Sequence, residues 1–182
     1  MNRKLKYILG TTEIIAFVAA ILIIVGASNG ASNTITVEST QVEIFVGILC
    51  FFSAMYGAAV GGLTGYLGVV CAFVIKGLTV PYATALSMAV YGGLVGWFAP
   101  KYRIREGQFG RRQVLLFLVI EAMACVAALI FIKPFLDYVM YDKDLYEMIT
   151  MGIHTSLICA LPMNLVLAIL FYVVNIFYRD DK

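Results

Sequence analysis

The sequence contains an uncharged apolar run that is too long for one helix across a membrane. Residues 44–75 are 32 consecutive positions without a charged side chain. A straight helix of that length would measure ~48 Å, whereas the hydrocarbon core of a bilayer is ~30 Å thick. The run therefore predicts two membrane helices, and we expect the turn between them around Tyr56, Gly57 and Ala58.

Further apolar runs bring the expected number of spans to six. They are residues 7–27, 77–100, 113–135 and 148–178. Only 13% of the residues are charged, about half the share in a soluble domain, which is roughly 25%. The first run also fits a cleavable signal peptide, and we interpret it as a retained helix. The sequence thus predicts an all-α integral membrane protein, a single domain over residues 1–182 built as a bundle of six transmembrane helices.

The basic residues predict how this bundle is oriented. Six spans place both termini on one side, and ten of the 13 lysines and arginines then share that side. These are Arg3, Lys4, Lys6, Lys101, Arg103, Arg105, Arg111, Arg112, Arg179 and Lys182. Cytoplasmic loops carry the excess of Lys and Arg, so we expect cytoplasmic N and C termini.

Several function classes are disfavoured by what the sequence lacks. A net charge of +2 gives no reason to expect nucleic acid as a partner, and no loop is long enough for an ATPase domain. The four cysteines lie in apolar runs and the chain has one histidine, so no metal site is expected. No hydrolase, metalloprotease or phosphate-binding motif is present, and no catalytic residue is predicted.

Small residues recur at helical spacing in three of the expected spans. Gly57, Gly61 and Gly65 stand four apart, as do Gly92 and Gly96. Such spacing lets two helices approach closely in lipid. Tight packing within the chain is the favoured interpretation, and contact with a partner or helix movement is the alternative.

The first span carries a similar face of small residues, Ala16, Ala19 and Ala20. Packing within the chain and docking of a partner helix both fit this face. Ionisable side chains within spans need a partner or a cavity. Glu13 and Glu121 lie in the cytoplasmic halves of their spans, and we expect one of them to pair with an arginine of the inner loop.

Polar and aromatic side chains toward the outer half are candidates for ligand contacts. Tyr82, Tyr91 and Tyr138 fit either an interfacial belt or stacking on a ligand. His154 could line a cavity open to the outside or form a hydrogen bond in the packing. Asn164 lies deeper, and an amide at that depth needs hydrogen-bond partners.

Two glycine-rich runs resemble a known family. FSAMYGAAVGGLTGYLG, residues 52–68, resembles the second-to-third-helix signature of the substrate-binding S components of energy-coupling factor (ECF) transporters, which import vitamins. YGGLVGWF, residues 91–98, followed by Lys101, is similar to the fourth helix and basic inner loop of that family. The number of spans and the orientation expected above agree with the resemblance.

The resemblance implies a non-catalytic transport subunit in the plasma membrane of a bacterium. Such a subunit binds a vitamin at its outer side, under the first loop, and topples in the membrane to deliver it inward. A transmembrane coupling subunit and two cytoplasmic ATPases drive this step, and the coupling subunit docks on the small-residue face of helix one, here Ala16, Ala19 and Ala20. Expected substrate contacts are Asn33, Lys76, Tyr82, Tyr91, Tyr138, His154 and Asn164.

The identity of the vitamin is predicted only from the resemblance and the first loop. The chain looks closest to the riboflavin-type S components, a group that includes cobalamin carriers. An Asp or His often follows the helix-three glycines in that family, whereas Val69 and Val70 stand here. Cobalamin is the first expectation because the first loop is long, flexible and almost uncharged; riboflavin is the second. The alternative is a stand-alone secondary carrier or channel for a small polar metabolite, although no inverted repeat supports it.

Overall fold

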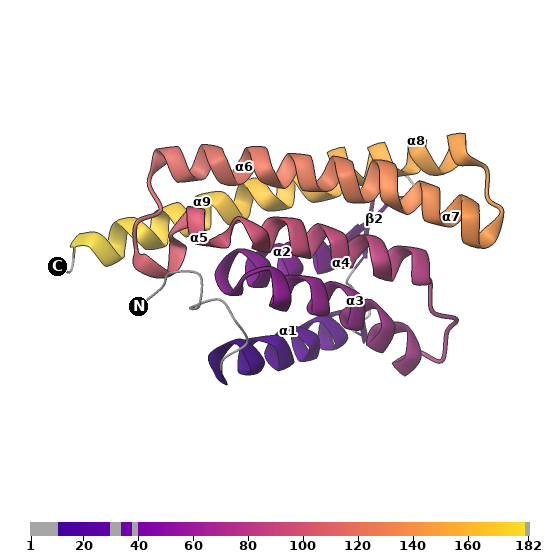
Figure 1. Ribbon diagram of the computed structural model, residues 1–182, viewed down its shortest axis with the longest axis horizontal. Helices are drawn as coiled ribbons and strands as arrows, with labels where there is room; N and C mark the ends of the chain where they lie inside the picture. Colours follow the sequence, from indigo (N-terminus) through magenta and orange to yellow (C-terminus); the bar gives the residue numbers. More distant parts are fainter. Residues whose placement is uncertain (1–10, 30–33, 38–39, 181–182) are drawn as a thin grey trace.

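The computed structural model describes residues 11–29, 34–37 and 40–180 (Figure 1). The first half of the fold consists of four helices and a hairpin: α1 (Thr11–Asn29), β1 (Thr34–Val37), β2 (Thr40–Glu43), α2 (Ile44–Tyr56), α3 (Ala58–Ile75) and α4 (Tyr82–Trp97). The second half consists of α5 (Ala99–Tyr102), the 3-10 turn η2 (Ile104–Glu106), α6 (Arg111–Cys125), the π-helix η3 (Val126–Ile132), α7 (Lys133–Tyr141), α8 (Leu145–Thr155), the π-helix η4 (Ser156–Ala160) and α9 (Leu161–Asp180).

The long uncharged run does form two helices. They meet at Gly57, whose backbone has φ 95°, a conformation that glycine adopts without strain. The Gly57 N–H donates to the Ser53 carbonyl at 2.9 Å, and its own carbonyl accepts from the Gly61 N–H at 2.9 Å. The predicted turn between α2 and α3 is confirmed, and it consists of a single residue.

The glycine pattern mediates contact within the chain, as favoured from the sequence. A Cβ atom added to Gly61 would collide with the backbone of Gly92, and one added to Gly65 would collide with the backbone of Met88. A side chain at Gly96 would likewise meet the backbone of Gly57. Helices α3 and α4 are therefore in backbone-to-backbone contact.

Helix α1 packs its alanines inward. Ala16 and Ala20 are buried in a cluster with Phe52 of α2 and Val60 of α3. Of the two alternatives for these alanines, the structure has packing within the chain. Neither Ala16 nor Ala20 is available to a partner in this conformation. Ala19 is only half-buried.

The second half is built from two composite helices. α6, η3 and α7 follow one another without a break, as do α8, η4 and α9, and the two run side by side (Figure 1). Helix α7 continues to Tyr141, beyond the apolar run 113–135, and only residues 142–144 separate it from α8. Asp144 caps α8 by accepting hydrogen bonds from the N–H groups of Tyr146 and Glu147, at 2.7 and 3.3 Å.

The predicted all-α architecture is confirmed for the bundle, and the first loop adds a short hairpin to it. β1 and β2 pair antiparallel, with Thr34 opposite Glu43, and β2 lies against α8 and η4. This part of the first loop was expected to be a flexible loop. Strand pairing replaces that expectation, since the TITV and TQVE segments are rich in β-branched residues.

The ends of the helices agree with an even number of crossings. In Figure 1 the start of α1, helix α5, the start of α6 and the end of α9 lie at one end of the bundle. By length and hydropathy, Ala58–Ile75 and Arg111–Tyr141 can each cross a membrane, and the bent pair Tyr82–Trp97 and Ala99–Glu106 can form a third span. The shorter apolar helices of the described residues are Thr11–Gly26, Phe45–Tyr56 and Leu161–Ile176. The six-span count and the cytoplasmic side stay predictions.

Candidate substrate site

A buried polar cluster joins three helices in the interior of the bundle. One carboxylate oxygen of Glu121, on α6, accepts hydrogen bonds from the Tyr91 hydroxyl at 2.6 Å and from the Cys125 thiol at 3.2 Å. The Asn164 amide on α9 donates to the same oxygen and also contacts the Tyr91 hydroxyl at 3.2 Å. Tyr91 comes from α4, so the cluster ties α4, α6 and α9 together.

The cluster contains two acceptors that no described residue satisfies. They are the second carboxylate oxygen of Glu121 and the amide oxygen of Asn164. Both side chains are fully buried, and a buried polar atom without a partner costs about 1–3 kcal/mol. Both oxygens therefore remain able to accept hydrogen bonds, while neither cavity described below is lined by a member of the cluster.

Local helix geometry places these side chains. Glu121 and Cys125 are one turn apart on α6, and the π-helix η3 begins at the next residue. The second π-helix, η4, ends one turn before Asn164. Wide π turns recur at functional sites because they displace side chains from regular helical positions.

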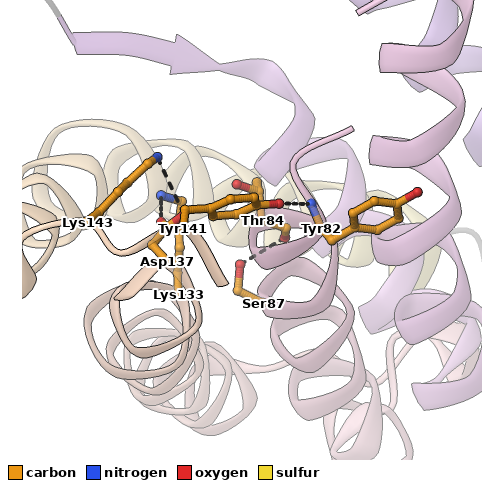
Figure 2. A network of polar contacts seen from close by, with 7 residues as sticks. All are labelled: Tyr82, Thr84, Ser87, Lys133, Asp137, Tyr141 and Lys143. Atoms are coloured by element: carbon orange, nitrogen blue, oxygen red, sulfur yellow. Dashed lines mark hydrogen bonds and ion pairs between the residues drawn. The ribbon is translucent and has the colours of Figure 1, made fainter. Parts of the chain in front are cut away.

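A second polar network lies where α4 begins and α7 ends (Figure 2). The backbone N–H of Tyr82 donates to the Tyr141 hydroxyl at 3.0 Å. Asp137, which is buried, pairs with Lys133 at 3.0 Å and with Lys143 at 3.6 Å. Figure 2 shows the Tyr82 ring pointing away from these contacts. The two lysines neutralise Asp137, while Asp142, Asp144 and Glu147 lie in the same segment of the chain.

The structure brings together two of the predicted substrate contacts, Tyr91 and Asn164. The ring of Tyr82 and the side chain of Tyr138 are exposed at the outer end. Lys76 and His154 are exposed as well, and neither lines a cavity described for residues 11–180. Asn33 lies outside the described residues.

The sequence-based reasoning missed part of the site. Glu121 was considered as a partner for an arginine, and Cys125 as a small buried hydrophobe, yet both belong to the central cluster. An ionisable residue within a span is by default a candidate for function, and this signal pointed to Glu121. Lys133 and Asp137 at positions i and i+4 also carried a signal, because that spacing favours an ion pair on a helix.

The predicted pairing of an intramembrane glutamate with the inner loop is confirmed for Glu13. Its carboxylate lies 2.9 Å from Arg105, whose guanidinium also stands over the Tyr56 ring at 5.3 Å. This contact fixes the inner end of α1 to the loop between α4 and α6. It is remote in sequence from the central cluster and has a structural role.

A separate cavity of about 390 Å³ lies among α1, α2 and α9 and is lined by apolar side chains. Its lining includes Ile23, Phe51 and Met163 but no member of the Glu121 cluster. Within the described ranges no group of three His, Cys, Asp or Glu side chains could hold a metal ion.

Apolar helices that enclose a buried polar cluster define a helical membrane protein with an internal polar site. The sequence matches the family described as "ECF-type riboflavin transporter, S component" over residues 9–176, and the chain belongs to this family. S components are substrate-binding transporter subunits and not enzymes.

The similar proteins are bacterial. A UPF0397 protein of Lactobacillus helveticus is 30% identical over 122 residues, which is 66% of this chain and 65% of the relative. UPF0397 proteins of Streptococcus agalactiae and Staphylococcus aureus are each 25% identical, over 77% and 72% of this chain and 76% and 72% of their own lengths. The chain thus spans slightly less than two thirds of the Lactobacillus relative. No solved structure matches the chain.

Proposed function

We propose that this chain is the membrane-embedded substrate-binding component of an ECF importer. It captures a vitamin on the outer side and delivers it inward by toppling, and separate ATPase subunits power this step through a transmembrane coupling subunit. The observation that carries the proposal is the family match over residues 9–176. Because the similar proteins are bacterial, we expect this subunit in the plasma membrane of a bacterium.

The central cluster supports a binding role for the polar interior. Tyr91, Glu121 and Asn164 come from three helices and converge on one point, where two acceptors need donors from outside the described residues. A ligand with several N–H or O–H groups meets that need. Flavins and cobalamins both carry such groups, so the hydrogen-bonding capacity of the cluster does not select between the two vitamins.

Cobalamin and riboflavin are both retained as substrates to test. The family description names riboflavin. The argument for cobalamin was a long, flexible first loop, and the hairpin of β1 and β2 weakens that argument.

The coupling subunit would dock on the outward face of α1. Ala16 and Ala20 are buried, whereas Ile15, Val18 and Leu22 are exposed and lie on one side of the helix together with Ala19. Their spacing of three and four residues forms one continuous apolar stripe. We therefore assign the docking role to this stripe, of which Ala19 is the one predicted member.

The test measures bound vitamin and then affinity. Small molecules that co-purify with the protein are identified by mass spectrometry, and riboflavin and cobalamin are each titrated against the ligand-free protein. Asn164→Leu should weaken binding about three- to ten-fold, the effect of losing one or two hydrogen bonds. Asn175→Leu is the matched control, because this amide of the same helix bonds only the Phe109 backbone, through N–H and C=O at 3.1 Å.

Two results would count against the proposal. Transport of a vitamin by the chain alone in liposomes would indicate a stand-alone carrier. Equal loss of affinity in the Asn164 and Asn175 variants would mean that Asn164 acts only through stability.

A further inference from the structure

A second groove opens between α6 and α9. It lies near the end of the bundle that holds Lys101, Arg103 and Arg105, which we call the basic end. It has a volume of about 300 Å³ and is lined by Arg111 and Val114 of α6 and by Ala168, Ile169 and Tyr172 of α9. Arg111 and Val114 are three positions apart, and Ala168 and Ile169 lie four and three positions before Tyr172, so each helix contributes one face. The volume lies at the lower limit for ligand pockets, roughly 300–1,000 Å³.

The groove is amphiphilic. Three of its lining side chains are aliphatic, and Tyr172 and Arg111 supply the polar part. Arg111 is the first residue of α6 and is exposed, so its charge lies at the end of the groove that faces the connection between α5 and α6. A cation at the mouth of an apolar groove matches an amphiphile with an anionic head group.

Arg111 differs from the other basic residues of this connection. Arg103 pairs with Glu106 at 2.9 Å, Arg105 pairs with Glu13 at 2.9 Å, and Lys101 stands 4.8 Å over the Phe98 ring. Among the side chains that the structure describes, which exclude those of residues 177–180, no carboxylate pairs with Arg111 or Arg112. Of these two arginines, only Arg111 lines the groove.

We propose that the groove between α6 and α9 binds one anionic phospholipid, with its phosphodiester on Arg111 and one acyl chain along Val114, Ala168 and Ile169. Charge complementarity selects the head group, because a guanidinium binds phosphate oxygens through two parallel hydrogen bonds. Basic pockets between membrane helices recognise anionic lipid head groups in this way. The site is separate from the Glu121 cluster and does not depend on the identity of the transported vitamin.

The lipid would join the two composite helices of the second half at the basic end. The α6 residues of the groove follow the connection from α5, and the α9 residues lie beyond Asn164 toward the C-terminal end of that helix. A bound acyl chain fills space between helices that must otherwise be filled by mobile lipid. The proposed role is therefore structural support of α6 against α9.

Native mass spectrometry of the full chain in detergent tests the proposal. The protein is stripped of lipid and titrated with phosphatidylglycerol and phosphatidylcholine that have identical acyl chains. Phosphatidylglycerol should bind at least about five-fold more tightly, the contribution of one arginine at a lipid surface. Arg111→Ala should reduce its affinity to that of phosphatidylcholine.

Arg112→Ala is the matched control, because it removes the same charge one residue away and leaves the groove intact. It should retain most of the preference for phosphatidylglycerol. Ile169→Trp, at an exposed position of the lining, should weaken both lipids by narrowing the groove. Equal binding of the two lipids, or equal effects of the two arginine variants, would overturn the proposal. Unchanged binding in Ile169→Trp would overturn the placement of the acyl chain.

Discussion

The contact between α3 and α4 and the contact between the two composite helices are built in opposite ways. The first brings backbone against backbone at Gly61 and Gly92, and both helices are regular. The second contains both π-helices and contributes Glu121, Cys125 and Asn164 to the polar cluster. A glycine contact has no side chains to rearrange, whereas a polar cluster with unsatisfied acceptors can exchange partners. If the cluster binds the ligand as proposed, the contact between α3 and α4 stays rigid and the contact between the two composite helices responds to the ligand.

The largest expected effect is on the rigid contact. Gly61→Leu should destabilise the protein by more than about 3 kcal/mol, because the added side chain meets the Gly92 backbone and overpacking already costs roughly 1–3 kcal/mol where side chains can yield. The measurement is the yield of monodisperse protein in detergent and its thermal unfolding. Gly93→Leu is the control, since nothing lies within 4 Å of a Cβ atom at Gly93. Similar loss in both variants would contradict a backbone contact.

An intermediate effect is expected in the polar cluster. Glu121→Leu removes the acceptor of Tyr91 and Asn164 and should lower the free energy of unfolding by about 1–3 kcal/mol. Glu121→Gln keeps an acceptor and should cost less than about 1 kcal/mol in the same thermal assay. If Glu121→Leu were more stable than Glu121→Gln, the polar cluster would lower the stability of the protein and only function would explain it. Ligand affinity would then be the quantity to compare.

The smallest expected effect is a difference in stability between the loss of two ion pairs at the basic end, Glu13 with Arg105 and Glu106 with Arg103. Glu13→Gln should destabilise the protein by about 1–2 kcal/mol, because hydrogen bonds to charged groups contribute roughly that much and the Glu13 side chain is buried. Glu106→Gln, in the half-exposed pair with Arg103, should cost well under about 1 kcal/mol. Thermal unfolding at low and high salt measures both. Equal effects would mean that α1 is not fixed by the Arg105 contact.

The features that follow from local composition could be predicted from the sequence. The length of the uncharged run required a break, and Gly57 provides it. The spacing of Gly61, Gly65 and Gly92 predicted close helix contact without naming the partner backbone atoms. Glu13 needed a cation, and the inner loop was the nearest source. Each of these follows from the composition of one segment, even where the partner is distant in sequence, as Arg105 is from Glu13.

The remaining features depend on how distant segments meet. Tyr91, Glu121 and Asn164 are far apart in sequence, and only the helix arrangement brings them to one point. The inward direction of Ala16 and Ala20 was undecided because a small face fits either a neighbour or a partner. The two π-helices carry a weak sequence signal, since an apolar run predicts a helix but not whether its hydrogen bonds follow the α or the π pattern. The signal of the hairpin is also weak, since each strand is only four residues long.

The π-helices also have a consequence for changes in chain length. A π turn contains one residue more than the α-helical turn that it replaces. The α-helical segments on both sides therefore face the same directions as in a regular α-helix that is one residue shorter. Removing one residue within Val126–Ile132 would let that turn close as α-helix while Glu121 before it and Asp137 after it stay on their present faces. Relatives that lack a residue there can therefore preserve both polar networks. The same deletion in α3 or α4 would rotate every later glycine away from its contact.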